Sequence, residues 1–170
     1  MSITRDIART YRAPREVLRR RVSGPPREDR ALAILMGACV LMFVEQWPFQ
    51  ARLAYENPDV PLDMRLGGAL MGWVFLAPLA FYVLAAVSHL VARVLGGQAR
   101  WFDARMALFW ALLASTPLWL LNGLVAGFVG PGPGQTIVGA AALLAFLVFW
   151  GAGLWDVETG QRDKGRGATA

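Results

Sequence analysis

The sequence predicts an all-α, polytopic membrane protein with four transmembrane helices arranged as two antiparallel hairpins, preceded by an amphipathic basic N-terminal arm. Of the 170 residues, 56% are hydrophobic, and they are gathered into long runs, as a lipid environment requires. The last run, 106–155, contains no Asp, Glu, Lys, Arg or His. It is long enough for two crossings, because one helix needs roughly 20 apolar residues to cross about 30 Å of hydrocarbon.

A Gly-Pro segment divides this last run into two helices. Residues 130–135 read Gly-Pro-Gly-Pro-Gly-Gln, which cannot continue a helix, because proline lacks an amide donor and glycine carries a high backbone entropy cost. The chain then divides into an arm over 1–30, a transmembrane domain over 31–155 and a tail over 156–170. Within the domain we expect helices over 31–49, 67–95, 106–129 and 136–155.

The N-terminal arm is rich in arginine and predicts two short helices separated near Pro14. Each has an apolar stripe at helical spacing, made by Ile3, Ile7 and Tyr11 and by Val17, Leu18 and Val22. Candidate contact residues for lipid or a partner are Arg12, Arg15, Arg19, Arg20 and Arg21. Two interpretations stay open. The arm lies in the headgroup layer, where an anionic leaflet attracts each arginine by about 1 kcal/mol, or it is solvated and holds the N-terminus in the cytoplasm.

The first transmembrane helix, 31–49, contains a carboxylate near its far end. Glu45 is the only acidic residue within an apolar run, and an ionisable group in a membrane is a candidate functional site. Trp47 follows closely, however, and tryptophan prefers the membrane interface. We therefore expect an interfacial carboxylate paired with Arg52 or Arg65, and the alternative is a proton or cation site.

A polar loop over 50–66 and a second helix over 67–95 are expected next. The second apolar run is longer than the hydrocarbon core, so the helix should tilt or extend into the interface, and Pro78 should kink it. His89 then falls near the cytoplasmic interface, where a snorkelling or hydrogen-bonding role is favoured over a ligand role.

The third helix carries polar side chains that suggest helix packing. Ser115 and Thr116 precede Pro117, and their hydroxyl groups can satisfy carbonyls that the proline frees. For Asn122, interhelical hydrogen bonding is favoured over substrate binding. Glycine pairs at four-residue spacing would allow close helix contacts; they are Gly68 with Gly72 and Gly123 with Gly127.

The distribution of basic residues predicts the topology. Apart from Arg52 and Arg65, they lie in the arm, around the connection between the second and third helices, or in the tail with Arg162, Lys164 and Arg166. The positive-inside rule then puts both termini in the cytoplasm. Arginine, alanine and glycine are abundant, which suggests a GC-rich bacterial genome and hence a bacterial inner membrane. Beyond Thr159 the tail is short, polar and glycine-rich, so we expect disorder.

Catalysis, metal binding and cofactor binding are not expected. Cys39 and His89 are the sole residues of their types and lie in separate runs, so they offer neither a nucleophile with its base nor a multi-ligand metal site. No Walker-type phosphate loop occurs. The net charge of +5 is not accompanied by a zinc-finger or RNA-binding aromatic motif, so nucleic acid is not an expected partner.

Three stretches together resemble a known family. They are residues 10–15 (Thr-Tyr-Arg-Ala-Pro-Arg) leading to 27–32 (Arg-Glu-Asp-Arg-Ala-Leu), residues 43–48 (Phe-Val-Glu-Gln-Trp-Pro) and residues 95–98 (Leu-Gly-Gly-Gln) before an aromatic loop. This pattern is similar to bacterial members of the Yip family, multi-pass membrane proteins named for eukaryotic relatives that bind Rab-type GTPases in vesicle traffic. The resemblance implies a membrane scaffold or adaptor and supplies no catalytic residues.

Two departures from that family limit what the resemblance implies. The Asp-Leu-Tyr-Gly and Gly-Tyr motifs of the eukaryotic members are absent, and we expect four helices where the family typically has five. Because those motifs are associated with the trafficking role, GTPase binding is not carried over to this chain.

The sequence therefore favours a non-catalytic scaffold or adaptor that works through protein or lipid contacts. Its expected partners are the lipid bilayer, with anionic lipids preferred, and a membrane protein or a second copy of the chain. One alternative is a small transporter or ion-coupled permease, in which an oligomer brings Glu45, Asn122 and the proline kinks around a shared pathway. Another is an accessory subunit of a larger bioenergetic complex.

Overall fold

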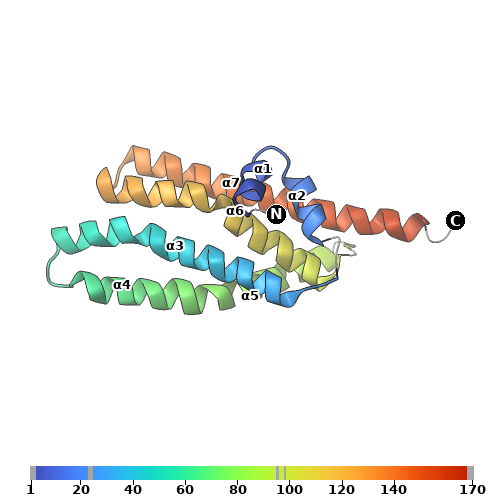
Figure 1. Cartoon of the computed structure of the whole chain (residues 1–170), viewed down its shortest axis with the longest axis horizontal. Coiled ribbons are helices and arrows are strands. Elements are labelled where there is room, and N and C mark those ends of the chain that lie inside the picture. The colour runs from blue at the N-terminus through green and yellow to red at the C-terminus, as the bar shows by residue number, and fades with distance from the viewer. Residues whose placement is uncertain (1–2, 23–24, 95, 98, 168–170) are drawn as a thin grey trace.

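The protein is a bundle of long helices with two short helices packed on its side (Figure 1). The computed structural model describes residues 3–22, 25–94, 96–97 and 99–167, with the backbone alone for 158–167. The helices are α1 (Ile3–Thr10), α2 (Pro14–Val22), α3 (Glu28–Glu56), α4 (Leu62–Leu70), η1 (Met71–Leu76), α5 (Ala77–Val94), α6 (Trp101–Phe128) and α7 (Pro133–Gly167). The described residues contain no strand, so the all-α prediction is confirmed.

Among the residues that the structure describes, four helical segments are long and apolar enough to cross a membrane. They are Glu28–Glu56, Leu62–Val94, Trp101–Phe128 and Pro133–Val157. A helix satisfies its own backbone hydrogen bonds, which is the condition for crossing hydrocarbon. The prediction of four transmembrane helices is confirmed, and the chain is a multi-pass membrane protein.

The connection between the first two spans is shorter than the sequence suggests. The expected polar loop over 50–66 is wrong, because α3 continues to Glu56 and α4 already begins at Leu62. An ion pair between Arg52 Nε and Glu56 Oε1, 2.7 Å apart, lies along the last turn of α3. Such pairs at four-residue spacing support a helix beyond its apolar part. The polar residues therefore extend the helix instead of ending it.

The second span runs through α4, η1 and α5 as one continuous helix with a widened turn. The segment Met71–Leu76 is π-helical and ends just before Pro78. A proline lacks the amide hydrogen and its ring clashes with the carbonyl four residues earlier, here Val74. A π-helical turn at this point relieves that clash. The irregularity beside Pro78 is therefore a π-helical segment, and the predicted kink stays a prediction.

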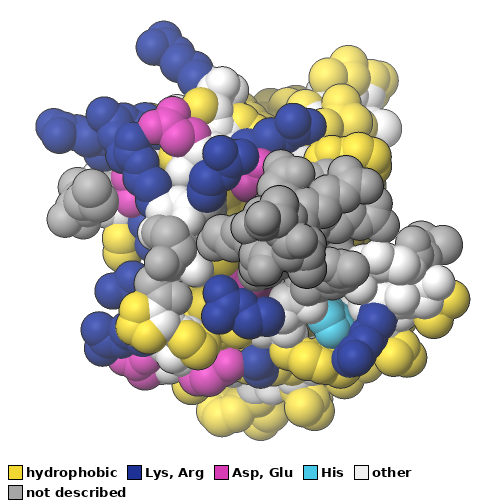
Figure 2. Space-filling view, turned by 90° about the vertical axis from the view of Figure 1, so that its right-hand side faces the viewer, with side chains coloured by type: hydrophobic (Ala, Val, Ile, Leu, Met, Phe, Trp, Pro, Cys, Tyr) yellow, Lys and Arg dark blue, Asp and Glu magenta, His cyan; other side chains and the backbone are white. Residues whose placement is uncertain are grey.

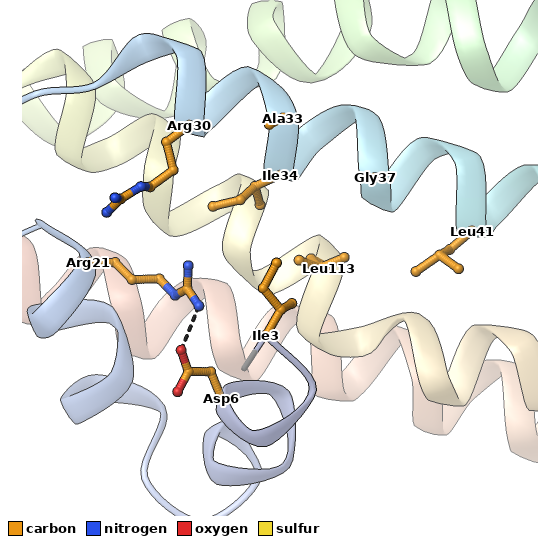
Figure 3. A pocket seen from close by; sticks show the side chains of 9 residues that line it. All are labelled: Ile3, Asp6, Arg21, Arg30, Ala33, Ile34, Gly37, Leu41 and Leu113. Atoms are coloured by element: carbon orange, nitrogen blue, oxygen red, sulfur yellow. Dashed lines mark hydrogen bonds and ion pairs between the residues drawn. The ribbon is translucent and has the colours of Figure 1, made fainter. Parts of the chain in front are cut away.

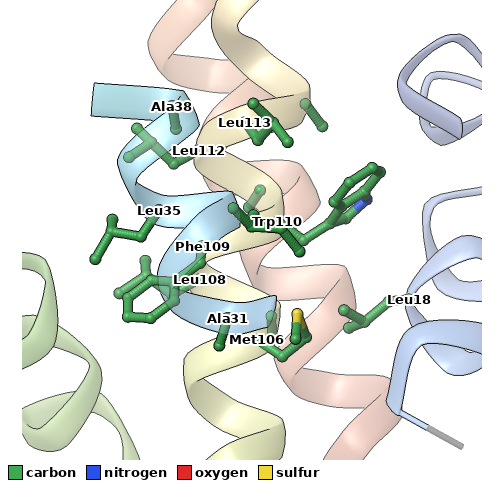
Figure 4. Packing of buried hydrophobic residues seen from close by; sticks show 14 of the residues in the cluster. Leu18, Ala31, Leu35, Ala38, Met106, Leu108, Phe109, Trp110, Leu112 and Leu113 are labelled. Atoms are coloured by element: carbon green, nitrogen blue, oxygen red, sulfur yellow. The ribbon is translucent and has the colours of Figure 1, made fainter. Parts of the chain in front are cut away.

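Helix α6 lies at the centre of the bundle. It packs mainly against α3 and α7, and α1, α2 and α5 also contact it. All residues from 106 to 116 are buried, which is typical of a helix surrounded on every face. Figure 4 shows several of them, among them Phe109 and Trp110, within the hydrophobic core. The Thr116 hydroxyl donates to the Leu113 carbonyl at 2.7 Å, the carbonyl that Pro117 frees. The predicted role of this hydroxyl is confirmed.

The backbone of α7 is helical as far as Gly167, whereas the sequence predicts disorder beyond Thr159. A helix that is already nucleated gains one hydrogen bond for each residue added, so a polar continuation remains helical. The side chains of Arg162, Lys164 and Arg166 lie outside the described residues, as do residues 168–170. Leu95 and Gln98 of the sequence motif and the helix-breaking Ser23 and Gly24 also lie outside them.

Candidate functional site

A carboxylate and an amide meet between α3 and α6. Asn122 Nδ2 of α6 donates to Glu45 Oε1 of α3 at 3.3 Å, and Gln46 Nε2 donates to Glu45 Oε2 at 2.7 Å. Glu45 is 6% exposed. A rise of 1.5 Å per residue puts it about 16 Å from the Glu56 end of α3. The predicted interhelical hydrogen bond of Asn122 is confirmed, and its partner is Glu45.

This arrangement replaces the expected pairing of Glu45 with an arginine. Arg52 pairs with Glu56 and donates to the Gly127 carbonyl at 3.4 Å, while Arg65 donates to the carbonyls of Val60 and Asn57. Both arginines lie towards the connection between α3 and α4, more than one helical turn from Glu45. The interfacial pairing is therefore wrong, because Glu45 is well inside the helix and faces α6.

Two glycines allow α3 and α6 to approach at this point. A Cβ atom at Gly123 would overlap the carbonyl oxygen of Glu45, and one at Gly127 would overlap Pro48. Small residues let the backbones of membrane helices come into contact. The close contact expected for Gly123 and Gly127 is confirmed. At Gly68 and Gly72, by contrast, a Cβ atom would meet no other atom within 4 Å among the described residues.

A half-open cavity of about 290 Å³ borders the polar pair. Its lining includes Glu45, Asn122 and Gln46 together with two tryptophans, Trp73 and Trp119. Asn122 Oδ1 and Trp119 Nε1 are buried and have no hydrogen-bond partner among the described residues. The rest of the lining is apolar, so water inside the cavity would find hydrogen-bond partners only at these polar groups.

His89 lies apart from this pair. It is 3% exposed and its ring centroid is 4.2 Å from that of Trp101. Its Nδ1 atom is buried without a hydrogen-bond partner among the described residues. Within the described part of the chain, no three side chains of His, Cys, Asp or Glu gather as metal ligands would. The imidazole is thus buried against an aromatic ring. Of the two roles expected for His89, snorkelling is wrong, and hydrogen bonding stays a prediction.

The N-terminal helices are held on the bundle by a tryptophan of α6. Trp110 Nε1 donates to Thr10 Oγ1 at 3.1 Å, and Arg21 Cζ lies 3.7 Å from the centre of the Trp110 ring. Arg21 Nη2 also donates to Asp6 Oδ2 at 2.7 Å. Burial lowers the pKa of the Arg21 guanidinium, the charge of Asp6 opposes this, and the nearby charge of Arg30 adds to the lowering. One indole thus joins α1, α2 and α6.

Further contacts fix α2 and the α1–α2 turn against α7. Leu18 is 2% exposed, and a Cβ atom at Gly153 would lie 2.8 Å from its Cδ2 atom. Arg19 Nη2 pairs with Asp156 Oδ1 at 2.6 Å, and the ring of Tyr11 meets Phe149 edge to face. The second apolar stripe of the arm therefore covers α6 and α7 of the same chain, an outcome that neither open interpretation included.

Of the five arginines that the sequence singles out in the arm, three make ion pairs within the described part of the chain and two do not. Arg19 and Arg21 bind other parts of the fold, and Arg20 pairs with Glu16. Arg12 and Arg15 are exposed and make no ion pair among the described residues. Figure 2 views the end of the molecule that carries the arm and shows Lys and Arg side chains gathered there. This end is an accessible basic surface.

Three residues of these sites were not anticipated from the sequence. Gln46 joins Glu45, Trp110 anchors the arm, and Arg30 lies close to Arg21. Gln46 stands next to Glu45 in an otherwise apolar run, and that position could have pointed to it. Trp110 gave no such signal, because an indole surrounded by apolar residues resembles any other core residue.

The comparisons with known proteins give one family. The Yip1 domain matches residues 9–170, a region that includes α2 to α7 and the end of α1. The match therefore covers both the polar pair and the exposed arginines from Arg12 onward. No match was found among the curated proteins or the solved structures.

Proposed function

Because this chain belongs to the Yip1 domain family, we propose that it is a non-catalytic membrane scaffold that recruits a partner through its arginine-rich arm. The strongest support is that some side chains of the arm bind the bundle while others stay exposed. Its apolar stripe and the side chains of Arg19 and Arg21 bind the bundle, which leaves Arg12 and Arg15 exposed on a fixed support.

A fixed support matters for recognition. A charged surface that is held on rigid helices loses less conformational entropy when a partner binds. Exposed charges mainly steer and orient an oppositely charged partner. The contacts of Trp110 and Leu18 supply that rigidity. An acidic surface of a membrane-associated protein is the chemistry that this arm would recognise, and contact with surrounding lipid is a consequence of its position in the membrane.

The location follows from the same charges. We place the chain in a bacterial inner membrane with both termini in the cytoplasm, since the basic residues outside Arg52 and Arg65 lie towards one end of the helices. The arm would then face the cytoplasm, and its partner would be a cytoplasmic or inner-membrane protein.

The test is a capture experiment on the full-length protein in nanodiscs. The Arg12→Gln, Arg15→Gln double variant removes two exposed charges from the arm. The matched control, Arg27→Gln with Arg93→Gln, removes the same charge from exposed residues outside the two arm helices. Partners are identified by mass spectrometry.

We expect a defined protein to be captured by the wild type and the control, and to be reduced at least tenfold with the arm variant. Equal capture by all three proteins would assign recognition to another surface. Loss with both variants would indicate a general charge effect, and absence of any partner would contradict the recruiting role.

A further inference from the structure

A cavity of about 550 Å³ lies between the N-terminal helices, α3 and α6. It is separate from the cavity beside Glu45. Figure 3 shows that its two ends differ in character: Arg21, Arg30 and Asp6 lie at one end, and apolar side chains extend along α3 to Leu41 at the other. A volume of this size is within the roughly 300–1,000 Å³ typical of small-molecule sites.

The charged end carries a net positive charge and unused hydrogen-bond donors. Arg21 binds Asp6, but its Nε atom is buried without a hydrogen-bond partner among the described residues. Arg30 is exposed, and no described carboxylate pairs with it. The positive charge of Arg30 is close enough to disfavour that of Arg21. An anion between the two guanidinium groups would relieve their repulsion. It would also accept hydrogen bonds from their N–H groups, whose planar arrangement suits phosphate.

The apolar end follows one face of α3. Arg30, Ala33, Gly37 and Leu41 recur at spacings of three and four residues, so they lie above one another on the helix surface. Ala33 and Gly37 are exposed, and a Cβ atom at Gly37 would meet no other atom within 4 Å among the described residues. No bulky side chain of the described residues therefore fills the middle of this strip.

The two ends also lie at different depths. A rise of 1.5 Å per residue puts Leu41 about 16 Å further along α3 than Arg30, and half of a hydrocarbon core is about 15 Å thick. The arginines therefore lie near the start of the membrane span, and the apolar strip extends towards the bilayer centre.

We propose that this cavity binds one anionic glycerophospholipid, with its phosphate between Arg21 and Arg30 and one acyl chain along Ala33, Gly37 and Leu41. Charge, polarity and depth all match a lipid in the leaflet next to the arm. A free phosphate would leave the apolar strip empty, and an acidic peptide would need to enter the hydrocarbon to reach Leu41. The inference goes beyond the proposed recruiting role, and either can fail without the other.

The test is lipid binding to the delipidated full-length protein in detergent, followed by native mass spectrometry. The probes are phosphatidylglycerol, phosphatidylcholine with the same acyl chains, and glycerol 3-phosphate, which lacks chains.

Arg30→Gln removes one phosphate contact, and Arg27→Gln, at the same end of α3, is its charge control. Gly37→Leu fills the apolar strip, and Gly68→Leu, which also faces open space, is its control. Circular dichroism melting checks that every variant is folded.

We expect the wild type to bind phosphatidylglycerol about tenfold more tightly than phosphatidylcholine. Both lipids carry the phosphate, but the choline cation of phosphatidylcholine would meet the net positive charge of the cavity end formed by Arg21, Arg30 and Asp6. Arg30→Gln should abolish this preference and Arg27→Gln should keep it. Gly37→Leu should weaken both lipids at least tenfold, with Gly68→Leu unchanged.

Three results would overturn the assignment. Equal binding of the two lipids by the wild type would remove the charge selectivity. Equal loss with Arg30→Gln and Arg27→Gln would indicate diffuse attraction to a basic surface. Binding of glycerol 3-phosphate as tight as that of phosphatidylglycerol, unaffected by Gly37→Leu, would assign the charged end to soluble phosphates.

Discussion

At the scale of single residues, the central feature is a carboxylate held between two amides inside the bundle. Glu45 accepts hydrogen bonds from Asn122 and Gln46, so both of its oxygens are used. A buried polar group without such partners is costly. The pair therefore has a sufficient explanation as a link between α3 and α6, and no transport role is needed to account for it.

A double-mutant cycle on Glu45 and Asn122 measures this link. We expect Asn122→Leu and Glu45→Leu, each of which removes one partner of the hydrogen bond, to show a coupling of about 1 kcal/mol in the free energy of unfolding, the usual size for hydrogen bonds between membrane helices. Unfolding in mixed micelles with increasing dodecyl sulfate gives the four free energies. A coupling near zero would mean that the Asn122 contact contributes nothing. Glu45→Gln should leave partner capture unchanged, whereas the permease alternative predicts that this substitution abolishes a transport activity.

At the scale of helices, the approach of α3 to α6 depends on the absence of side chains at two positions. The backbone of Glu45 and the ring of Pro48 occupy the space where side chains at Gly123 and Gly127 would lie. Glycine is therefore required at these two positions by helix packing, and not by backbone conformation.

Gly123→Ala should lower the free energy of unfolding by about 1–3 kcal/mol, because its Cβ forces the two backbones apart. Gly68→Ala is the matched control. It faces open space and should stabilise the helix by about 0.5–1 kcal/mol, since alanine loses less backbone entropy. The same micelle titration compares the two. Similar effects of both substitutions would contradict the close contact between α3 and α6.

The docking of the arm is a second prediction at this scale. Leu18→Asp puts a carboxylate into a buried site, and the cost of burying a charge should release α2 from the bundle. Trypsin should then cleave within the arm on the order of ten times faster, because cleavage follows the population of the open form.

Ala8→Asp is the control for this experiment. It introduces the same carboxylate at an exposed position of α1 and should leave the cleavage rate close to that of the wild type. Cleavage rates are read from the intact mass of the protein over time. Rapid cleavage of the wild type itself would show that the arm is not docked.

At the scale of the whole molecule, the ends of the bundle differ in charge. The arm and the basic residues at the start of α6 lie at one end, while the connection from α3 to α4 and the helix ends that flank it carry three carboxylates, Glu56, Asp59 and Asp63. The positive-inside rule predicts that the basic end lies in the cytoplasm.

Cysteine labelling in intact cells tests this orientation. Cys39 is buried, and Cys39→Ser gives a cysteine-free background. We expect Asp59→Cys and Pro131→Cys to react with a membrane-impermeant maleimide in intact cells, and Pro25→Cys to react only after permeabilisation. Reaction of Pro25→Cys in intact cells would reverse the orientation. If one of the variants Asp59→Cys and Pro131→Cys reacted in intact cells and the other did not, the prediction of four crossings would be wrong.

Much of the element-scale description could be predicted from the sequence. The four spans are visible because bilayer thickness sets a minimum length for each apolar run. The ends of the helices were less predictable, as α3 shows, because a polar flank such as 50–56 extends a helix that the apolar run has already nucleated. The role of Thr116 was predictable because its partner, the Leu113 carbonyl, is local.

What the sequence determined by itself was the class of protein, the number of crossings and the uneven distribution of charge, since each depends on composition and length along the chain. The tertiary structure alone decided that Glu45 binds Asn122, that Trp110 holds the arm and that Arg21 lies near Arg30. These contacts join residues far apart in the chain, and they depend on how closely and at what angle the helices cross. That geometry is set by packing, at positions such as Gly123.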